Sequence, residues 1–566
     1  MKLVVVGGVA GGASAAARVR RLDESARIRV FERGDAVSYS NCSLPYYLGG
    51  LVESADNLIM MTPGGFKKRH NIDVCVNHEV IAIDRAAKCV TVKNTVTGET
   101  FREPYDKLLL SPGASPIMPA SIKGIDRENV FSVRNVNDVV RIRTWLDRDG
   151  VKDVVVVGGG FIGVEVAENL KLTGKNVTIV EGMGQILVPF DYDMVQYLEK
   201  ELYDHGVQLC LNSTLTAVED GHIAAAHDGE EFTIAADAVI MAIGVAPETA
   251  LARDAGLEIG QTRGIKVNER MQTSDPDIYA VGDAVETFNA QTGLPGRLAL
   301  AGPAQRQARV AADHMCGIDS AYKGFIGSSC IRVFDLNAAS TGLNERTAAA
   351  AGIAFDSVNV YPADKVGIMP ESHYMAFKLL FSVPDGKLLG AQAIGKGDAI
   401  RRVDSVAALI SMGGTVEDLK DFEHCYAPLF STAKDVVTMA ALVAGNVLCG
   451  RLKQVHVSQI RPLVESGAYI LDVREKSEYA RAHIEGAHNI PLSVLREHLG
   501  EIPRDRPVYL HCRTSQRSYY AYCTLRDSGF ENVFNLSGSF LGLCLFEYFN
   551  DKTRNRTPIV TDYNFN

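Results

Sequence analysis

The chain has 566 residues, 46% hydrophobic and 22% charged, a composition typical of a folded protein with several domains. A formal net charge of -10 argues against general nucleic-acid binding, and we find no apolar run of about 18 residues, the length that spans a membrane. The start "MKLVVVGG" runs into glycines instead of a signal-peptide cleavage site, so we expect a cytoplasmic protein with reduced thiols. The 11 cysteines form no CxxC or CxxxxC pair, so we expect no metal site.

The first stretch predicts a dinucleotide-binding unit. "KLVVVGGVAGGASAAARVRR" reads as an apolar strand, a glycine turn and a helix, and the next strand, "RIRVFER", ends in Glu32. An acidic residue at this distance supplies a partner for a ribose hydroxyl. Val9 replaces the middle glycine of the GxGxxG pattern, but its neighbours still let a pyrophosphate approach the helix. The glycines assigned to this turn are Gly7, Gly8, Gly11 and Gly12.

A lone cysteine, Cys42, stands in "SYSNCSLPYYLGG" just before Pro45. Because proline is favoured in the first turn of a helix, we expect a helix to begin there. Cys42 would then lie at its positive end, where a thiolate is favoured. Most of the other cysteines are expected to be ordinary small buried residues: Cys75, Cys89, Cys210, Cys316, Cys330, Cys449, Cys523 and Cys544.

The helix after the first glycine turn carries a basic face. Ser14, Arg18 and Arg21 follow one another at helical spacing and therefore share one side. They form either a local anion site or a solvated basic surface, and spacing alone leaves both open.

The glycine pattern returns in "VVVVGGGFIGVEVAENL", where Gly158, Gly160 and Gly163 match all three positions. The following strand, "NVTIVEG", ends at Glu181, and an acidic residue there favours NADH over NADPH. Two copies of the pattern in one chain favour dinucleotide binding over turns that merely close tight loops.

A third motif decides the expected arrangement. "TSDPDIYAVGDAVE" is an apolar strand ending in Gly282 and Asp283, and it resembles the second FAD motif of the pyridine nucleotide-disulfide oxidoreductases. "LLLSPGASP" and "MAIGVAPE" resemble the crossover segments of that family. The resemblance implies a split FAD domain of residues 1–113 and 245–325, an NAD domain of residues 114–244, and a ribityl contact for Asp283. The alternative interpretation is that Asp283 only caps its loop and contacts no flavin.

In one branch of that family a CxxxxC disulfide relays electrons from the flavin, but here Tyr47 stands five positions after Cys42. Cys42 could form a sulfenic acid, form a mixed disulfide with a small thiol, or be inert. "SYSNCSLPYY" closely resembles the coenzyme A disulfide reductases, with Ser40 and Ser43 as small departures. That resemblance implies contacts to coenzyme A from Ser14, Arg18, Arg21, Ser38 and Asn41.

Residues 326–445 resemble the dimerisation domain of the same family, which implies a homodimer. "VNVYPADK" supplies Tyr361, and "CYAPLFSTAKDVV" supplies Tyr426 and Lys434. The resemblance places the two tyrosines near the partner's active-site cysteine and the lysine near coenzyme A. Taken singly, either tyrosine could equally be an ordinary buried residue whose hydroxyl has a hydrogen-bond partner. Cys425 should point elsewhere.

We assign further positions on the same resemblance. The residues expected to contact FAD or NADH are Gly7, Gly8, Gly11, Gly12, Glu32, Arg33, Val80, Ser111, Gly113, Arg134, Asp283, Ala301, Gly158, Gly160, Gly163, Glu181 and Gly244. Arg306 joins the residues expected to bind substrate.

After a linker at 446–455, residues 456–550 begin a new α/β pattern, followed by a tail at 551–566. The strand "PVYLH" opens into a loop from Cys512 to Ser518 and then a helix, a geometry that forms an anion cradle and lowers a cysteine pKa. The segment strongly resembles a rhodanese domain. This implies that Cys512 carries a persulfide while Arg513 and Arg517 hold the sulfur donor. Ser515 stands where the loop of such domains often has glycine. The alternative is that the domain is a scaffold that carries no sulfur.

The whole chain thus resembles coenzyme A disulfide reductases fused to a rhodanese domain, also described as NADH-dependent persulfide reductases. The resemblance implies that NADH and FAD reduce Cys42, which acts on coenzyme A persulfide, polysulfide or coenzyme A disulfide. Cys512 would supply the sulfur, and Tyr361 and Tyr426 of the neighbouring subunit would donate protons. The partners are small sulfur compounds, with no nucleic acid or membrane. An NADH oxidase or peroxidase that forms a sulfenic acid is the first alternative, and a non-enzymatic redox sensor the second.

Overall fold

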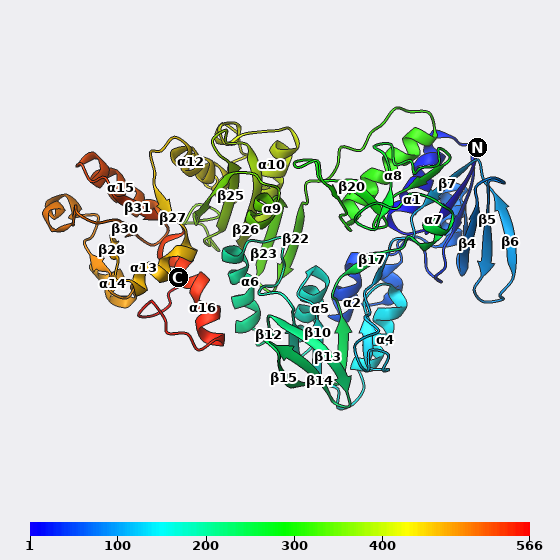
Figure 1. The fold of residues 1–566 in the computed structure, drawn as a ribbon, viewed down its shortest axis with the longest axis horizontal. Coiled ribbons are helices and arrows are strands. Elements are labelled where there is room, and N and C mark those ends of the chain that lie inside the picture. The colour runs from blue at the N-terminus through cyan, green and yellow to red at the C-terminus, as the bar shows by residue number, and fades with distance from the viewer. Residues whose placement is uncertain (566) are drawn as a thin grey trace. The chain divides into compact units, whose positions relative to one another are not determined.

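The computed structural model describes residues 1–565, and the chain divides into two compact units (Figure 1). The first unit contains Met1–Gly184 and Cys210–Phe325. The second contains Gln185–Leu209 and the chain from Ile326 onward. Each unit is built around its own sheets and cores.

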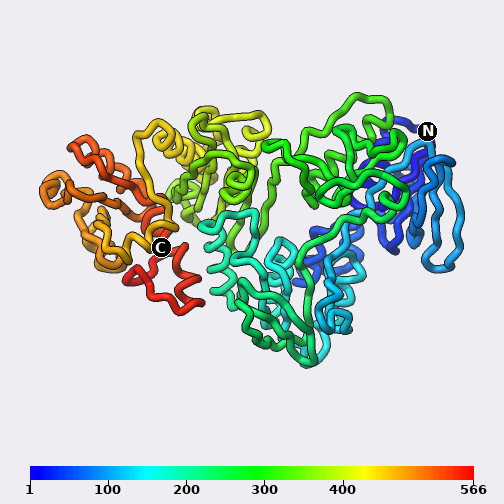
Figure 2. Tube along the Cα trace, viewed as in Figure 1, coloured from blue at the N-terminus to red at the C-terminus, as the bar shows by residue number. Residues whose placement is uncertain are grey.

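A five-stranded parallel sheet joins both ends of the first unit, in the order β19-β7-β1-β2-β3. Figure 2 shows the blue start of the chain beside the green stretch that carries the last of these strands. Helices α1 and α8 share a core, in which alanines such as Ala15 and Ala308 let them approach closely. The elements are β1 (Lys2–Val6), α1 (Ala10–Leu22), β2 (Arg27–Phe31), α2 (Leu44–Leu48), α3 (Pro63–His70), β3 (Asp73–Cys75), β7 (Lys107–Leu110), β19 (Ile278–Ala280) and α8 (Ala301–Met315).

A second five-stranded sheet, β12-β11-β10-β16-β9, forms from the middle of the chain. Its strand β10 pairs in parallel with β11 and β16, and its continuous valine run reflects burial on both faces. The elements are β9 (Val130–Ser132), α4 (Val136–Leu146), β10 (Asp153–Val157), α5 (Phe161–Leu172), β11 (Asn176–Val180), β12 (Gln208–Cys210), β16 (Ala238–Met241) and α7 (Ala250–Asp254).

The two crossover segments expected from the sequence lie side by side. Strand β8 pairs antiparallel with β17, so the chain enters and leaves the middle region at one place. Three small sheets complete the first unit. The strands are β4 (His78–Asp84), β5 (Cys89–Asn94), β6 (Thr100–Pro104), β8 (Ala114–Pro116), β13 (Ser213–Glu219), β14 (His222–His227), β15 (Glu230–Ala235), β17 (Val245–Pro247), β18 (Ile265–Lys266), β20 (Val285–Phe288) and β21 (Pro295–Gly296).

The second unit begins with an antiparallel sheet, β22-β23-β26-β25-β24. Helices α10 and α12 cover it, burying residues such as Val403 and Val437 against Phe377 and Leu379. The elements are β22 (Ser329–Val333), β23 (Leu336–Gly342), α9 (Glu345–Ala350), β24 (Phe355–Val360), β25 (Ala376–Ser382), β26 (Leu388–Gly395), α10 (Ala399–Ser411), α11 (Val416–Lys420) and α12 (Val436–Leu448).

A parallel sheet, β27-β31-β30-β28-β29, forms the last part of the second unit. Strand β27 comes from the predicted linker yet joins this sheet, and Val560 of the predicted tail pairs with Ile484. The elements are β27 (Gln454–Val455), α13 (Ile460–Glu465), β28 (Tyr469–Asp472), α14 (Lys476–Arg481), β29 (His488–Asn489), β30 (Val508–His511), α15 (Gln516–Asp527), β31 (Val533–Leu536) and α16 (Ser539–Thr553).

Helix α6 (Tyr192–Asp204) comes from the predicted NAD domain but packs within the second unit. Gln196 accepts a hydrogen bond from Asn550 of α16 at 2.9 Å, and Asp193 pairs with Lys378 of β25 at 2.7 Å. The domain boundaries assigned from the sequence stay predictions. Over residues 1–565 no helix is long and apolar enough to cross a membrane, and no group of three or more His, Cys, Asp or Glu side chains could hold a metal ion.

Candidate functional site

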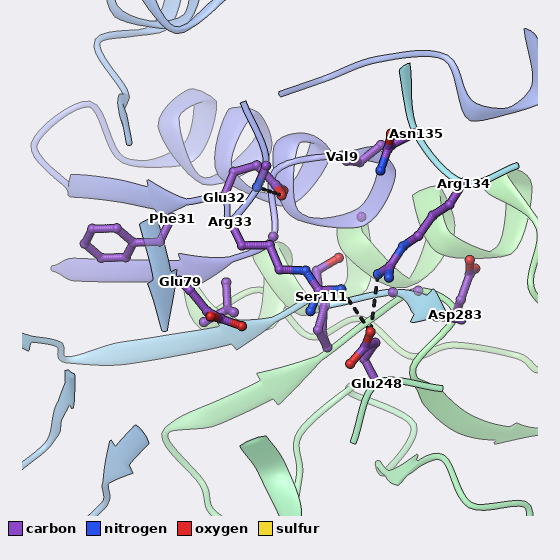
Figure 3. Close-up of a pocket in the computed structure, with 18 of the residues that line it drawn as sticks. Val9, Phe31, Glu32, Arg33, Glu79, Ser111, Arg134, Asn135, Glu248 and Asp283 are labelled. Carbon is purple, nitrogen blue, oxygen red and sulfur yellow. Dashed lines mark hydrogen bonds and ion pairs between the residues drawn. The ribbon is translucent and has the colours of Figure 1, made fainter. Parts of the chain in front are cut away.

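A cavity of about 520 Å³ opens in the first unit where the glycine turn, the end of β2 and the Asp283 loop meet (Figure 3). Because these segments converge from distant parts of the chain, the cavity is a product of the split sheet. Ten residues predicted to bind cofactor or substrate line it: Gly7, Gly11, Glu32, Arg33, Asn41, Val80, Ser111, Gly113, Arg134 and Asp283.

Each glycine turn leaves no room for a side chain. A Cβ atom on Gly12 would lie 1.9 Å from the carbonyl oxygen of Gly7, and one on Gly163 would lie 1.9 Å from that of Gly158. Neither α1 nor α5 has a side-chain cap on its first amide groups. Open N–H groups beside a bare backbone turn fit the pyrophosphate of a dinucleotide at both places.

Glu32 and Glu181, the acidic partners of the two glycine turns, are anchored in the same way. Glu32 accepts hydrogen bonds from the N–H groups of Gly8 at 2.9 Å and Gly34 at 3.0 Å. Glu181 accepts from Gly159 at 2.6 Å and Met183 at 2.7 Å. Each carboxylate therefore stands at the end of its strand, against the glycine turn, where a ribose would bind.

The sequence interpretation missed Glu248, which two predicted cofactor residues contact. Arg33 donates to its carboxylate at 2.9 Å and Arg134 approaches within 3.4 Å, as Figure 3 shows. Burial opposes ionisation of Glu248, but the Ser115 hydroxyl and the Arg33 guanidinium outweigh it, so its pKa is lowered. No motif marks Glu248, although it directly follows "GVAP" in the return crossover.

Two other predicted cofactor residues, Ala301 and Gly244, are exposed and do not line this cavity, whereas Val80 is buried in its wall. Burial raises the pKa of Asp283 at the cavity, and Arg297 opposes that effect. Four further predicted residues belong to the second glycine turn and to the strand that follows it: Gly158, Gly160, Gly163 and Glu181.

Cys42 is exposed and lies in a 3-10 turn, Asn41–Ser43, just before α2. A helix does begin there, but it has five residues, too few for a strong dipole. The pKa of the Cys42 thiol is raised, first by partial burial and then by the carboxylates of Glu165 and Asp283. The expectation that the helix favours a thiolate was therefore wrong for this chain, since negative charge and desolvation prevail.

The predicted basic face is divided. Arg18 forms an ion pair with Asp313 of α8 at 2.7 Å, whereas Arg21 is exposed. Burial lowers the pKa of His70, and the positive charges of Arg69 and Arg21 lower it further. The charge of Arg21 therefore acts on the last turn of α3, which is itself basic: Lys67, Lys68, Arg69 and His70. Ser14 and Ser38 are half-buried, and Arg306 is exposed on α8.

The two predicted tyrosines differ in environment. Tyr361 is 4% exposed, stacks on Tyr197 at a ring distance of 6.1 Å, and fits against Gly542 of α16 and Gly538 just before that helix. Burial raises its pKa to about 12. Tyr426 is 51% exposed. Lys434 is exposed on the same connecting segment as Tyr426, between α11 and α12. Their assignment to the active site stays a prediction.

Cys512 lies at the loop between β30 and α15, with a side chain only 1% exposed. Its sulfur accepts from the hydroxyls of Ser518 at 3.6 Å and Ser539 at 3.9 Å. Ser515 adopts the left-handed conformation, with φ of 71°, which explains why glycine is frequent there. These contacts surround the sulfur with hydroxyl donors.

The two predicted donor-binding arginines already have partners. Arg517 makes two hydrogen bonds to Glu478, at 2.6 and 2.8 Å. Arg513 donates to the carbonyl oxygen of Asn564 in the C-terminal tail at 2.8 Å, while its Nη2 atom is buried with no hydrogen-bond partner among the described residues. Arg513 therefore keeps one unused donor near Cys512.

The other cysteines only partly match expectation. Cys89 and Cys544 are buried, but Cys330 and Cys449 are exposed, so the prediction of burial was wrong for these two. Cys330 lies in the edge strand β22 at a position that alternates outward, and Cys449 follows the last residue of α12, so their place in the fold leaves both thiols exposed.

Comparison with known proteins places these features in context. Residues 1–308 match the family described as pyridine nucleotide-disulphide oxidoreductase. The chain belongs to the pyridine nucleotide-disulphide oxidoreductases. Residues 328–437 match the dimerisation domain of this family, and residues 457–544 match the rhodanese-like domain.

Among members of the family, the coenzyme A disulfide reductase of Staphylococcus haemolyticus is 33% identical over 449 residues, covering 79% of this chain and 100% of that protein. The structure of reduced CoADR-RHD from Bacillus anthracis has a TM-score of 0.93 and 42% identity, covering 97% of this chain and 98% of that one. An NAD-dependent persulfide reductase from A. fulgidus has a TM-score of 0.89 and 35% identity, covering 96% and 100%.

These comparisons confirm the family predicted from the sequence, including the rhodanese fusion, and the expected fold class of two dinucleotide-binding domains, a dimerisation domain and a rhodanese domain. As a pyridine nucleotide-disulphide oxidoreductase, the chain is a flavin-dependent enzyme.

Proposed function

We propose that the chain is an NADH-dependent flavoprotein reductase of coenzyme A persulfide, polysulfide and coenzyme A disulfide. The observation that carries the proposal is the pairing of two sulfur-handling cysteines in one chain. Cys42 stands beside a dinucleotide cavity with Tyr47 in place of a second cysteine, and Cys512 stands in a rhodanese-like loop. The oxidised partner of Cys42 must therefore come from a substrate.

The relatives support this choice of substrate. Their names describe reduction of coenzyme A disulfide and of persulfide, and the two solved structures named above cover 97% and 96% of this chain. The cofactors are FAD, NADH and coenzyme A. FAD fits the first glycine turn with Glu32 and Asp283, and NADH fits the second turn with Glu181. When bound, FAD supplies a two-electron path between NADH and a disulfide.

In the proposed reaction, the Cys42 thiolate attacks the sulfur attached to coenzyme A in a persulfide. The S–S bond breaks, hydrosulfide leaves with the bonding pair, and a mixed disulfide forms between Cys42 and coenzyme A. Two electrons and a proton return this disulfide to the Cys42 thiolate and free coenzyme A. Overall, NADH, a proton and the persulfide give NAD⁺, coenzyme A and hydrogen sulfide.

Cys512 extends the reaction. We propose that it takes a sulfane sulfur and passes it to coenzyme A, with Arg513 and Arg517 binding the anionic donor. Lys434, Ser14, Arg18, Arg21, Ser38, Asn41 and Arg306 are proposed to bind coenzyme A. The proposed working form is a cytoplasmic homodimer joined through residues 326–445, in which Tyr361 and Tyr426 face the partner's Cys42.

Steady-state rates with all three acceptors, measured with NADH and with NADPH, test the proposal. Cys42→Ser should retain bound flavin but lose at least a hundredfold in rate, because no thiolate remains to attack sulfur. Cys512→Ser should lose rate only where a sulfane sulfur must first be transferred. Cys330→Ser, which removes another exposed thiol, is the matched control.

Retained activity in Cys42→Ser would remove this residue from the mechanism, and unchanged turnover of every acceptor in Cys512→Ser would end the relay. Coenzyme A that copurifies in stoichiometric amount supports the proposal over an NADH oxidase, since an oxidase has no use for a bound coenzyme.

A further inference from the structure

Ser539 begins α16, and its backbone has an unusual conformation. Its φ angle is 53°, in the left-handed region that glycine adopts freely and that other residues occupy at a cost. Gly538, directly before it, also has a positive φ, of 82°. The Ser539 side chain is fully buried. A strained conformation that persists in a buried turn points to a function of the side chain that it carries.

The Ser539 hydroxyl lies against Cys512. Its oxygen accepts a hydrogen bond from the backbone N–H of Cys512 at 2.9 Å and lies 3.9 Å from the Cys512 sulfur. Because a lone pair of this oxygen takes the amide hydrogen, the hydroxyl hydrogen can be donated to the sulfur. Ser518 brings a second hydroxyl to 3.6 Å from the sulfur, but this group also lies 3.1 Å from the carbonyl oxygen of Ser515. Ser518 therefore divides its hydrogen between two acceptors.

The first amide groups of α16 fasten Ser539 to the loop that carries Cys512. The N–H of Phe540 donates to the carbonyl oxygen of Cys512 at 3.1 Å. The N–H of Leu541 donates to the carbonyl oxygen of Arg513, also at 3.1 Å. Since Ser539 directly precedes these two residues, its backbone cannot move away from the loop unless both hydrogen bonds break.

The antiparallel sheet of the second unit also holds this turn. The hydroxyl of Ser537 accepts a hydrogen bond from the backbone N–H of Asn359 in β24 at 3.2 Å. A Cβ atom on Gly538 would lie 3.0 Å from the ring of Tyr361, so the turn has little room to shift toward that ring. Because the turn is held by both the loop and the sheet, the left-handed conformation of Ser539 is sustained despite its cost.

The charged and titratable groups on the elements packed around Cys512 leave a role for a neutral donor. Arg517 is paired with Glu478 at 2.6 Å, and Asp472 lies 3.6 Å from His511. These groups are the same in every variant below, so a difference among the variants reports the changed side chain. They are His511 of β30, Asp472 of β28, Arg474 after it, Glu478 of α14, Arg513 of the loop, Arg517 of α15 and Cys544 of α16.

We propose that Ser539 is a further catalytic residue of sulfur transfer at Cys512, and that its hydroxyl donates a hydrogen bond to the Cys512 sulfur when this sulfur is a thiolate. The inference rests on the proposed function. In the first step, the thiolate attacks the outer sulfur of a sulfane donor such as thiosulfate. The S–S bond of the donor breaks, sulfite leaves with the bonding pair, and a Cys512 persulfide forms.

The second step regenerates the same thiolate. The thiolate of coenzyme A attacks the outer sulfur of the Cys512 persulfide, the S–S bond breaks, and the Cys512 thiolate leaves with the bonding pair. Charge and electrons balance in each step without a further reactant. Negative charge is on the Cys512 sulfur before the first step and after the second, and the Ser539 hydroxyl stabilises it at both points.

The test follows alkylation of Cys512 by iodoacetamide against pH, on the Cys512 peptide of the flavin-loaded full chain after reduction with dithiothreitol. In Ser539→Ala the midpoint of this profile should move up by about one pH unit, because a hydrogen bond to a charged group is lost. The plateau at high pH should not fall, since a less stabilised thiolate is at least as nucleophilic. Restricted access to the thiol would instead lower the plateau and leave the midpoint in place.

Ser539→Gly separates the hydroxyl from the backbone strain. Both Ser539 variants lose the hydroxyl, so both midpoints should move alike. Glycine adopts the left-handed conformation freely, so Ser539→Gly should unfold at a higher urea concentration than Ser539→Ala. If the reactivity of Cys512 merely followed stability, the two variants would differ in their midpoints as well.

Ser537→Ala is the matched control, because it removes a hydroxyl from the same turn that contacts β24 and not the sulfur. It should keep the wild-type midpoint even if it unfolds more easily. Sulfur transfer is the second readout. Loading of Cys512 from thiosulfate and delivery of this sulfur to coenzyme A should each slow about threefold at pH 7 in both Ser539 variants.

An unchanged midpoint in Ser539→Ala and Ser539→Gly overturns the inference, because the hydroxyl then does not bind the thiolate. An equal shift in Ser537→Ala also overturns it, since that result reports a loosened turn. If wild-type Cys512 takes up no sulfur from thiosulfate or polysulfide, the relay in the proposed function fails, while the alkylation midpoints still decide whether Ser539 stabilises the thiolate.

Discussion

At the scale of single residues, the chemistry depends on what surrounds each reactive group. Cys42 was identifiable from its lone position and its neighbours in the sequence, but its pKa is raised first by partial burial and then by the charges of Glu165 and Asp283, which lie far along the chain. Arg18 shows the same dependence, since Asp313 neutralises a charge that the helical spacing left free. A residue type indicates possible chemistry, and its contacts determine which chemistry is available.

The glycine turns allow a residue-scale prediction. Gly12→Ala forces a Cβ atom against the Gly7 carbonyl oxygen, so we expect it to destabilise the first unit by about 1–3 kcal/mol and to lower FAD content at least tenfold. Gly163→Ala should leave FAD bound and raise the KM for NADH instead. The ratio of flavin absorbance to protein and the KM for NADH are the measurements.

The control for these variants is Gly64→Ala in α3, where the nearest neighbouring atom is 4.0 Å from the added methyl group. It should keep full flavin content and gain slightly in stability, because alanine favours a helix. Normal flavin loading in Gly12→Ala would show that the first turn does not contact the pyrophosphate.

At the scale of elements, short segments join parts that the sequence analysis kept separate. Strand β27 comes from the predicted linker, α6 from the predicted NAD domain, and the tail pairs with Ile484 through Val560. The tail also reaches the rhodanese-like loop, because the Asn564 carbonyl accepts a hydrogen bond from Arg513. These segments have local patterns too short to reveal where they pack.

The tail contact leads to a prediction about Cys512. Removing the chain from Tyr563 onward keeps the buried pair Ile559 and Val560 but deletes the Asn564 carbonyl. Arg513 then becomes free to move, so Cys512, now 1% exposed, should react with iodoacetamide about tenfold faster and accept thiosulfate sulfur faster. Peptide mass analysis of alkylated Cys512 gives the rate.

Phe565→Ala is the matched variant for this truncation, because it trims the same tail and keeps the Asn564 carbonyl. Its Cys512 should react at the wild-type rate. Equal reactivity in the truncated and full-length proteins would mean that the tail does not restrict access to this thiol.

At the scale of the whole molecule, buried charge holds the second unit together. Lys378 is 2% exposed and contacts Asp193 at 2.7 Å, Glu345 at 2.8 Å and Asp191 at 3.2 Å. These acids come from α6, α9 and the turn before α6, so the lysine ties a segment of the middle chain to the antiparallel sheet. The pKa of Lys378 is raised by these carboxylates despite its burial, and it stays charged at neutral pH.

Replacing this lysine should therefore be costly and pH-dependent. Lys378→Met leaves buried carboxylates without a counter-charge and should destabilise the second unit by about 3–5 kcal/mol at pH 7.5. Burial already raises the Asp191 pKa, and without Lys378 it rises further. A carboxyl whose folded pKa exceeds its unfolded value favours folding as pH falls, so the penalty should shrink at pH 5.5.

Urea unfolding of Lys378→Met and of the double variant with Asp193→Asn checks this prediction. The double variant removes one uncompensated charge and should recover part of the loss. A penalty that is equal at both pH values would assign the effect to packing instead of charge.

The sequence by itself determined the two glycine turns with their acidic partners, the lone Cys42, the Cys512 loop and the order of the domains. These features are readable because each depends on residues within one strand, turn and helix, where backbone geometry dictates the residue type. Only the tertiary structure decided that Tyr46 reaches Glu165, that Glu248 joins Arg33 and Arg134, and that the tail reaches Arg513. Those contacts join residues far apart in the chain, and no local spacing encodes such an approach, because it arises only when separate sheets and helices bury their apolar faces together.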